Sequence, residues 1–166
     1  MDLTAFDALP AADAEAELLA CCGSRRWAAA VAAGRPYRDL DHLQAAADEA
    51  WWSLDEADWH EAFAAHPRIG ERPTGDGAHA RWSAAEQSAA GRSEAAVRDE
   101  IARGNRAYEE RFGHVFLIAA SGKSGEEILA ELRRRLDGTP EEELRTAAEE
   151  QAKITRLRLA RLVETG

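Results

Sequence analysis

The sequence predicts an all-α protein, a single bundle-like domain of roughly eight helices over residues 1–166. β-Branched residues are few and rarely alternate with polar ones, so strand signals are nearly absent. Alanine, the best helix former, supplies much of the 45% apolar share, and helix start and stop signals recur along the chain. A chain of 166 residues is long enough to bury one hydrophobic core.

Three helices are expected in the first part of the chain. One follows Ser24 and covers residues 25–33, because Gly34-Arg35-Pro36 then ends it. The next is amphipathic and covers residues 40–51. The third is expected to open with a capping box, Ser53-Leu54-Asp55-Glu56, and to continue to about Ala65.

Residues 66–82 interrupt this helical pattern. They contain five strong helix breakers in seventeen positions, namely Pro67, Gly70, Pro73, Gly75 and Gly77. Loops of this length are uncommon inside compact domains and are often functional. We therefore expect functional residues in and around this loop.

Four more helices are expected in the second half, at residues 83–90, 93–112, 125–136 and 140–163. Gly113 ends the second of these. Pro140 at the first helical position, followed by three glutamates, is typical of a helix N-terminus. The apolar residues 115–120 form the one short run that could be extended.

The formal net charge of −10 argues against two classes of partner. Such a chain repels phosphate backbones and anionic membranes, so we expect no nucleic-acid or membrane partner. An anionic small-molecule substrate remains possible if it enters a locally positive pocket.

The two cysteines, Cys21 and Cys22, are adjacent and therefore make poor disulfide partners. We expect a reducing cytoplasm, since the sequence also shows no secretory leader and no run long enough to span a membrane. The histidines and cysteines have no metal-ligand spacing, so no metal site is predicted.

His66 stands where a helix is expected to end and the breaker-rich loop to begin. Histidine can give or take a proton near neutral pH, and Pro67 restricts the backbone of the residue before it. The alternative is structural, because a histidine near a helix C-terminus interacts well with the helix dipole. The residues alone leave both readings open and make the structural one the commoner.

Ser83, Glu86 and Gln87 also have two readings. Ser-x-x-Glu is a capping box, and this is the commoner reading. The same helix N-terminus could bind an anionic ligand, with Glu86 favouring protonated His66 and Gln87 recognising an amide edge.

Arg158 lies between Ile154 and Leu162 on one helical face, so it must pair with a carboxylate, extend to solvent or bind a ligand. Asn105 and Tyr108 share a face of the long helix, where a polar contact in the core is the alternative to a site. The run 115–120 could likewise be plain core.

Together these fragments resemble the 2-oxo-4-hydroxy-4-carboxy-5-ureidoimidazoline (OHCU) decarboxylase family. The His-Pro-Arg-Ile-Gly run at residues 66–70 matches the family's loop signature, and Ser-x-x-Glu-Gln follows at 83–87. Asn-x-x-Tyr at 105–108 leads into Phe-Gly-x-x-Phe-Leu-Ile-x-Ala at 112–120. Lys-Ile-x-x-Leu-Arg-Leu closes the pattern at 153–159, and Trp27 with Arg35-Pro36 resembles its beginning.

The resemblance implies an all-helical, often dimeric enzyme of urate breakdown that forms (S)-allantoin by decarboxylation without a cofactor. It implies catalytic roles for His66, as proton donor, and for Glu86. It implies substrate contacts at Pro67, Ser83, Gln87, Phe116, Ile118, Ala119, Ala120 and Arg158. Two alternatives are another lyase or hydrolase of ureide metabolism and a non-catalytic helical interaction module.

Overall fold

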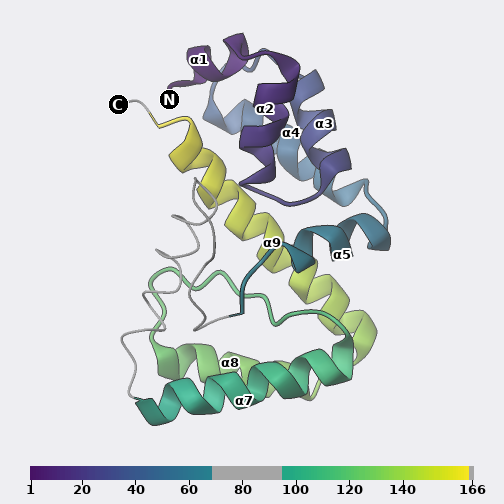
Figure 1. Ribbon diagram of the computed structural model, residues 1–166, viewed down its shortest axis with the longest axis vertical. Helices are drawn as coiled ribbons and strands as arrows, with labels where there is room; N and C mark the ends of the chain where they lie inside the picture. Colours follow the sequence, from purple (N-terminus) through teal and green to yellow (C-terminus); the bar gives the residue numbers. More distant parts are fainter. Residues whose placement is uncertain (69–94, 165–166) are drawn as a thin grey trace. The chain divides into compact units, whose positions relative to one another are not determined.

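The computed structural model describes residues 1–68 and 95–164. These ranges contain eight helices and no strand (Figure 1), which confirms the all-α prediction. The helix expected at 83–90 lies outside the described residues. In chain order the helices are α1 (Leu3–Ala8), α2 (Ala11–Leu19), α3 (Arg25–Ala33), α4 (Leu40–Trp52), α5 (Glu56–Ala64), α7 (Ala95–Phe112), α8 (Gly125–Leu136) and α9 (Pro140–Leu162).

The chain divides into two compact units. Unit 1 comprises Met1–Ala65 and Ala152–Gly166, and unit 2 comprises His66–Gln151. Helix α9 contributes its first half to unit 2 and its second half to unit 1. That all of residues 1–166 form one domain stays a prediction.

In unit 1, short polar side chains begin the helices as the sequence indicates. The Ser24 hydroxyl accepts a hydrogen bond from the Trp27 N–H at 3.2 Å and caps α3. The Asp39 carboxylate accepts from the His42 N–H at 2.8 Å and caps α4. Each cap satisfies a backbone donor that has no partner within its helix.

The capping box predicted at Ser53 is wrong by two residues. Asp55 is the N-cap of α5, and its carboxylate accepts from the Asp58 N–H at 3.1 Å. Ser53 instead ends α4, where its hydroxyl lies 3.0 Å from the carbonyl oxygens of Glu49 and Ala50. Serine and aspartate are both good N-caps, so local sequence did not distinguish the two positions.

The core of unit 1 contains polar contacts between elements distant in sequence. The fully buried Trp27 ring donates from Nε1 to the Ala47 carbonyl at 3.0 Å, joining α3 to α4. Arg35 donates to the carbonyl oxygens of Phe6 and Leu9, at 2.9 and 2.8 Å. These bonds join Arg35, which follows the C-cap of α3, to carbonyl oxygens at the end of α1.

The second half of α9 is bound to α4 within unit 1. The Gln44 side chain donates to the Arg156 carbonyl at 3.0 Å and accepts from the Arg156 guanidinium at 3.1 Å. Arg156 also pairs with Asp48. This two-way contact joins parts of the chain more than a hundred residues apart.

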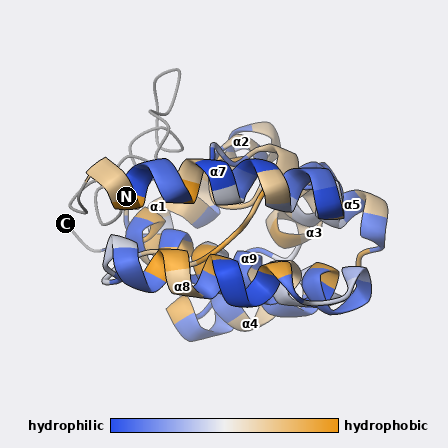
Figure 2. Cartoon of the chain, turned by 90° about the horizontal axis from the view of Figure 1, so that it is seen from below, coloured by the Kyte–Doolittle hydropathy of each residue, from blue (hydrophilic) through white to orange (hydrophobic). Residues whose placement is uncertain are grey.

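In unit 2, α7 and α8 pack side by side (Figure 1). A Cβ atom on Gly104 would lie 2.5 Å from Leu132 Cδ2, so the missing side chain permits this close approach. Gly113 has φ +79°, which explains why α7 ends there. A full capping box between Ser124 and Glu127 starts α8, which carries both polar and apolar residues as expected for a helix with one buried face (Figure 2).

Among the described residues, no helix is long and apolar enough to cross a membrane. Within the same ranges, 1–68 and 95–164, no three His, Cys, Asp or Glu side chains are grouped to hold a metal ion.

The substitution Ser24→Ala removes the buried N-cap hydroxyl of α3. It is expected to lower the free energy of unfolding by about 1–2 kcal/mol, because the Trp27 N–H loses its acceptor. Ser53→Ala is the matched control, since Ser53 is exposed and ends a helix, and it should change stability by about 0.5 kcal/mol or less. Urea denaturation of both variants measures the difference. Equal losses would show that the Ser24 cap contributes little.

Candidate functional site

The segment 116–120 follows Gly113 and is neither helix nor strand. Four of its five residues are buried, namely Phe116, Leu117, Ile118 and Ala120. Two side chains hold its backbone. Arg135 donates from Nη1 to the Leu117 carbonyl at 2.6 Å, and the Glu150 carboxylate accepts from the Ala119 N–H at 3.1 Å. The Leu117 carbonyl and the Ala119 N–H are thus bonded to side chains of α8 and α9 in place of a neighbouring strand.

A buried ion pair is bonded to this segment through Arg135. Arg135 Nε and Glu143 Oε1 are 2.7 Å apart, and the two side chains are only 1% and 4% exposed. The Tyr108 hydroxyl donates to the same carboxylate oxygen at 2.8 Å. The Arg135 guanidinium also lies 4.7 Å from the centre of the Phe116 ring, in a cation–π contact. The charges lose water but gain several polar partners, as a buried pair requires.

Tyr108 acts here as a structural donor. Burial raises the pKa of its hydroxyl well above the ordinary range, so the group stays protonated at physiological pH. Its ring packs edge-on against Phe116, with centroids 5.4 Å apart. Asn105, one turn earlier, is also buried. The contacts of Tyr108 therefore agree with the alternative of a polar core contact beneath residues 115–120.

His66 directly follows Ala65, the C-cap of α5, and is partly buried. Its ring atom Nε2 lies 2.6 Å from Oε1 of Gln151, a distance at which a hydrogen bond forms. Gln151 is fully buried on α9. The candidate proton donor is therefore held by a side chain from the other end of unit 2.

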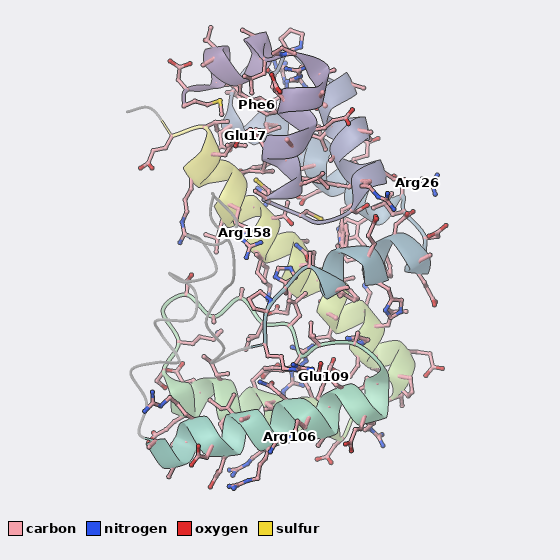
Figure 3. All side chains as sticks on the ribbon, in the orientation of Figure 1. Phe6, Glu17, Arg26, Arg106, Glu109 and Arg158 are labelled. Carbon is pink, nitrogen blue, oxygen red and sulfur yellow. The ribbon has the colours of Figure 1, made fainter. Side chains whose placement is uncertain are left out.

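Arg68 holds the same stretch of chain from another side. Its Nε donates to Glu109 Oε2 on α7 at 2.7 Å, and Figure 3 shows Glu109 on that helix. The Arg68 side chain is half exposed, so this pair adds little stability by itself. Its role is to fix the path of residues 66–68, because these residues are bonded to both α9 and α7.

Neither Gln151 nor Glu150 was selected from the sequence. A signal was present, because a buried helical face of α9 carries polar residues among apolar ones. That face consists of Ala147, Ala148, Gln151, Ile154, Thr155 and Arg158. A glutamine at such a position needs a polar partner, as the buried Arg158 does. The partner, His66, lies 85 residues away and could not be read from local spacing.

The structure therefore brings together part of the predicted site. His66 contacts Gln151, and Ala119 contacts Glu150, so adjacent residues of α9 join the loop start to segment 116–120. Pro67 follows His66 and is partly buried. Ser83, Glu86 and Gln87 lie outside the described residues.

Arg158 belongs to unit 1, whereas the other described site residues belong to unit 2. It is 1% exposed on α9 (Figure 3), and its Nη1 lies 3.5 Å from the Ala20 carbonyl oxygen. The free thiols of Cys21 and Cys22 are nearby and buried. Burial raises the pKa of Cys22 to about 12, although hydrogen bonds and the positive charge of Arg158 oppose the shift.

Comparisons with known proteins agree on one family. A family model described as OHCU decarboxylase matches residues 7–160. The chain is 38% identical over 151 residues to the Arabidopsis thaliana uric acid degradation bifunctional protein TTL, covering 89% of this chain and 47% of that protein. It thus spans about half of that bifunctional relative.

Two further relatives match over most of their own length. The OHCU decarboxylase of Amia calva is 37% identical over 139 residues, or 82% of this chain and 79% of that protein. A crystal structure of an OHCU decarboxylase in the presence of (S)-allantoin is 35% identical, with a TM-score of 0.79. That match covers 90% of this chain and 98% of the other.

Arg135→Met is expected to lower the free energy of unfolding by about 3–5 kcal/mol, because it leaves Glu143 buried without its counter-charge. Arg133→Met is the matched control on the same helix. Arg133 pairs with Glu100 at the surface, so its loss should cost about 1 kcal/mol or less. Denaturation in guanidinium chloride compares the two, and similar losses would contradict a structural role for the buried pair.

The raised pKa of Cys22 predicts a pH dependence of stability. The neutral thiol is favoured in the folded state, so its contribution is complete below the ordinary cysteine pKa of about 8.5 and is lost as pH rises toward 12. The free energy of unfolding should therefore fall above about pH 8.5, by up to about 1.4 kcal/mol per pH unit from this group. Cys22→Ala should remove that part of the slope. An unchanged slope would disprove the assignment.

Proposed function

Because this chain belongs to the OHCU decarboxylase family, we propose that it decarboxylates 2-oxo-4-hydroxy-4-carboxy-5-ureidoimidazoline to (S)-allantoin in urate breakdown. It is then a carboxy-lyase. The observation that carries the proposal is the family match over residues 7–160, because this range contains every site residue expected from the sequence.

The substrate can supply its own electron sink. When the carboxylate leaves as CO2, the electron pair of the broken bond enters the ring, where imine and carbonyl groups spread the charge. The enzyme then has to hold the carboxylate out of the ring plane, stabilise the developing enolate-like charge and deliver one proton to one face. Delivery to a single face yields a single enantiomer.

We assign that proton to His66. The ring is partly buried and held by Gln151, so it has a defined direction from which to donate. Glu86 is proposed to keep it protonated, and Ser83 and Gln87 to orient the ring of the substrate. Pro67 and the segment with Phe116, Ile118, Ala119 and Ala120 are proposed to line the pocket. Arg158 is proposed to bind the anionic substrate.

Two further properties belong to the same proposal. We propose that the protein works in the cytoplasm, and the two buried free thiols support a reducing compartment. We propose a homodimer, which is what the family resemblance implies. Sedimentation of the purified chain would measure the dimer directly.

The test uses substrate freshly generated from urate and follows the circular dichroism of the allantoin formed. Spontaneous decay gives racemic product, so a dichroic signal reports the enzymatic route. Wild-type protein is expected to give the (S) enantiomer alone. His66→Asn and His66→Ala should reduce the enzymatic rate by roughly 10²–10⁴-fold, the usual contribution of a positioned acid.

His42→Asn is the matched control, because His42 caps a turn in unit 1 by accepting from the Arg38 N–H. It should retain the wild-type rate and stereochemistry. Near wild-type formation of (S)-allantoin by both His66 variants would end the assignment of the proton donor. Racemic product from the wild-type protein would end the proposed function itself.

A further inference from the structure

We propose that Gln151 is a positioning residue that selects the Nε2–H form of His66 and fixes the direction of its ring. The inference deepens the proposed function and rests on it, since it concerns the same proton donor. Neither the loop signature nor the other motifs of the sequence include Gln151.

The geometry supports a specific contact between the side chains of Gln151 and His66. Gln151 is fully buried on α9, and its side-chain oxygen lies 2.6 Å from His66 Nε2. Immobilising a long amide side chain in the interior costs conformational freedom, so such a residue is stable there only with polar partners. The contact joins α9 to the first residue of the loop that carries the family signature.

The direction of the bond follows from the atoms involved. Oε1 of an amide is only an acceptor, so the proton between the two atoms belongs to His66 Nε2. In the neutral ring, Nε2–H then leaves the lone pair on Nδ1. In the imidazolium both nitrogens carry protons, and the contact to Oε1 persists. Gln151 is thus compatible with His66 before and after it gives up one proton.

An amide also avoids a problem that a carboxylate would create. A glutamate at this place would bring a negative charge beside the ring and would hold the imidazolium more strongly than the neutral amide does. The neighbouring Glu150 is bonded to the Ala119 N–H, and the Arg68–Glu109 pair joins residues 66–68 to α7. Both contacts involve charged side chains on α9 and α7.

The tautomer can be measured directly on the wild-type protein. Long-range ¹H–¹⁵N correlation spectra of the histidine rings distinguish Nε2–H from Nδ1–H, and His66→Asn identifies the His66 signals among the five histidines. Above the midpoint of its titration, His66 is expected to be the Nε2–H tautomer. A predominant Nδ1–H tautomer would overturn the proposal.

Two substitutions of similar volume separate positioning from packing. Gln151→Leu removes the acceptor, so the tautomer should become mixed and kcat should fall about 10- to 100-fold, as for one lost hydrogen bond to an ionised group. KM should change little, because Gln151 acts through His66. Gln151→Glu restores an acceptor and should return the Nε2–H signature and raise the titration midpoint of His66.

Gln44→Leu is the matched control, since Gln44 is also buried on a helix but contacts Arg156 in unit 1. It should leave the His66 spectrum and kcat unchanged. If Gln151→Leu keeps the wild-type tautomer and kcat, Gln151 has no positioning role. If Gln151→Leu does not fold, the tautomer of His66 in the wild-type protein and in Gln151→Glu still tests the proposal. An inactive wild-type protein would contradict the proposed function, whereas an active one with Nδ1–H contradicts only the role of Gln151.

Discussion

The buried ion pair between Arg135 and Glu143 is the interaction on which unit 2 depends. Two charges removed from water are costly, so they must be paired and their remaining donors and acceptors satisfied. Tyr108 and the Leu117 carbonyl provide these partners. The pair therefore links α7, α8, α9 and segment 116–120 at one point, and each of these elements has to lie where its polar group can reach it.

The candidate site follows from this constraint. Glu143 lies near the start of α9, so the pair sets the rotation of the helix two turns later, where Glu150 and Gln151 stand. Glu150 then meets the backbone of segment 116–120, and Gln151 meets His66. Consecutive residues of one helix thus hold segment 116–120 and the proposed proton donor.

Local chemistry allowed six of the eight described helices to be predicted, whereas α1 and α2 were not expected from the sequence. Long-range pairing explains which site residues were missed. Ser24, Gly113 and the Thr139-Pro140 start acted as the sequence indicates, because a cap depends on its nearest neighbours. The start of α5 was predicted wrongly at Ser53, because Asp55 two residues later is an equally good N-cap. His66 was found through its loop signature. Gln151 and Glu150 were not, because a buried polar residue reveals that it needs a partner without revealing which one.

Binding of (S)-allantoin to ¹⁵N-labelled protein tests the location of the site most directly. We expect the product to perturb the backbone signals of Ala119, Ala120 and His66 and the side-chain amide of Gln151, and the (R) enantiomer to do so more weakly. Saturable perturbations confined to α1–α4, or equal responses to both enantiomers, would contradict a stereospecific site built around His66 and segment 116–120.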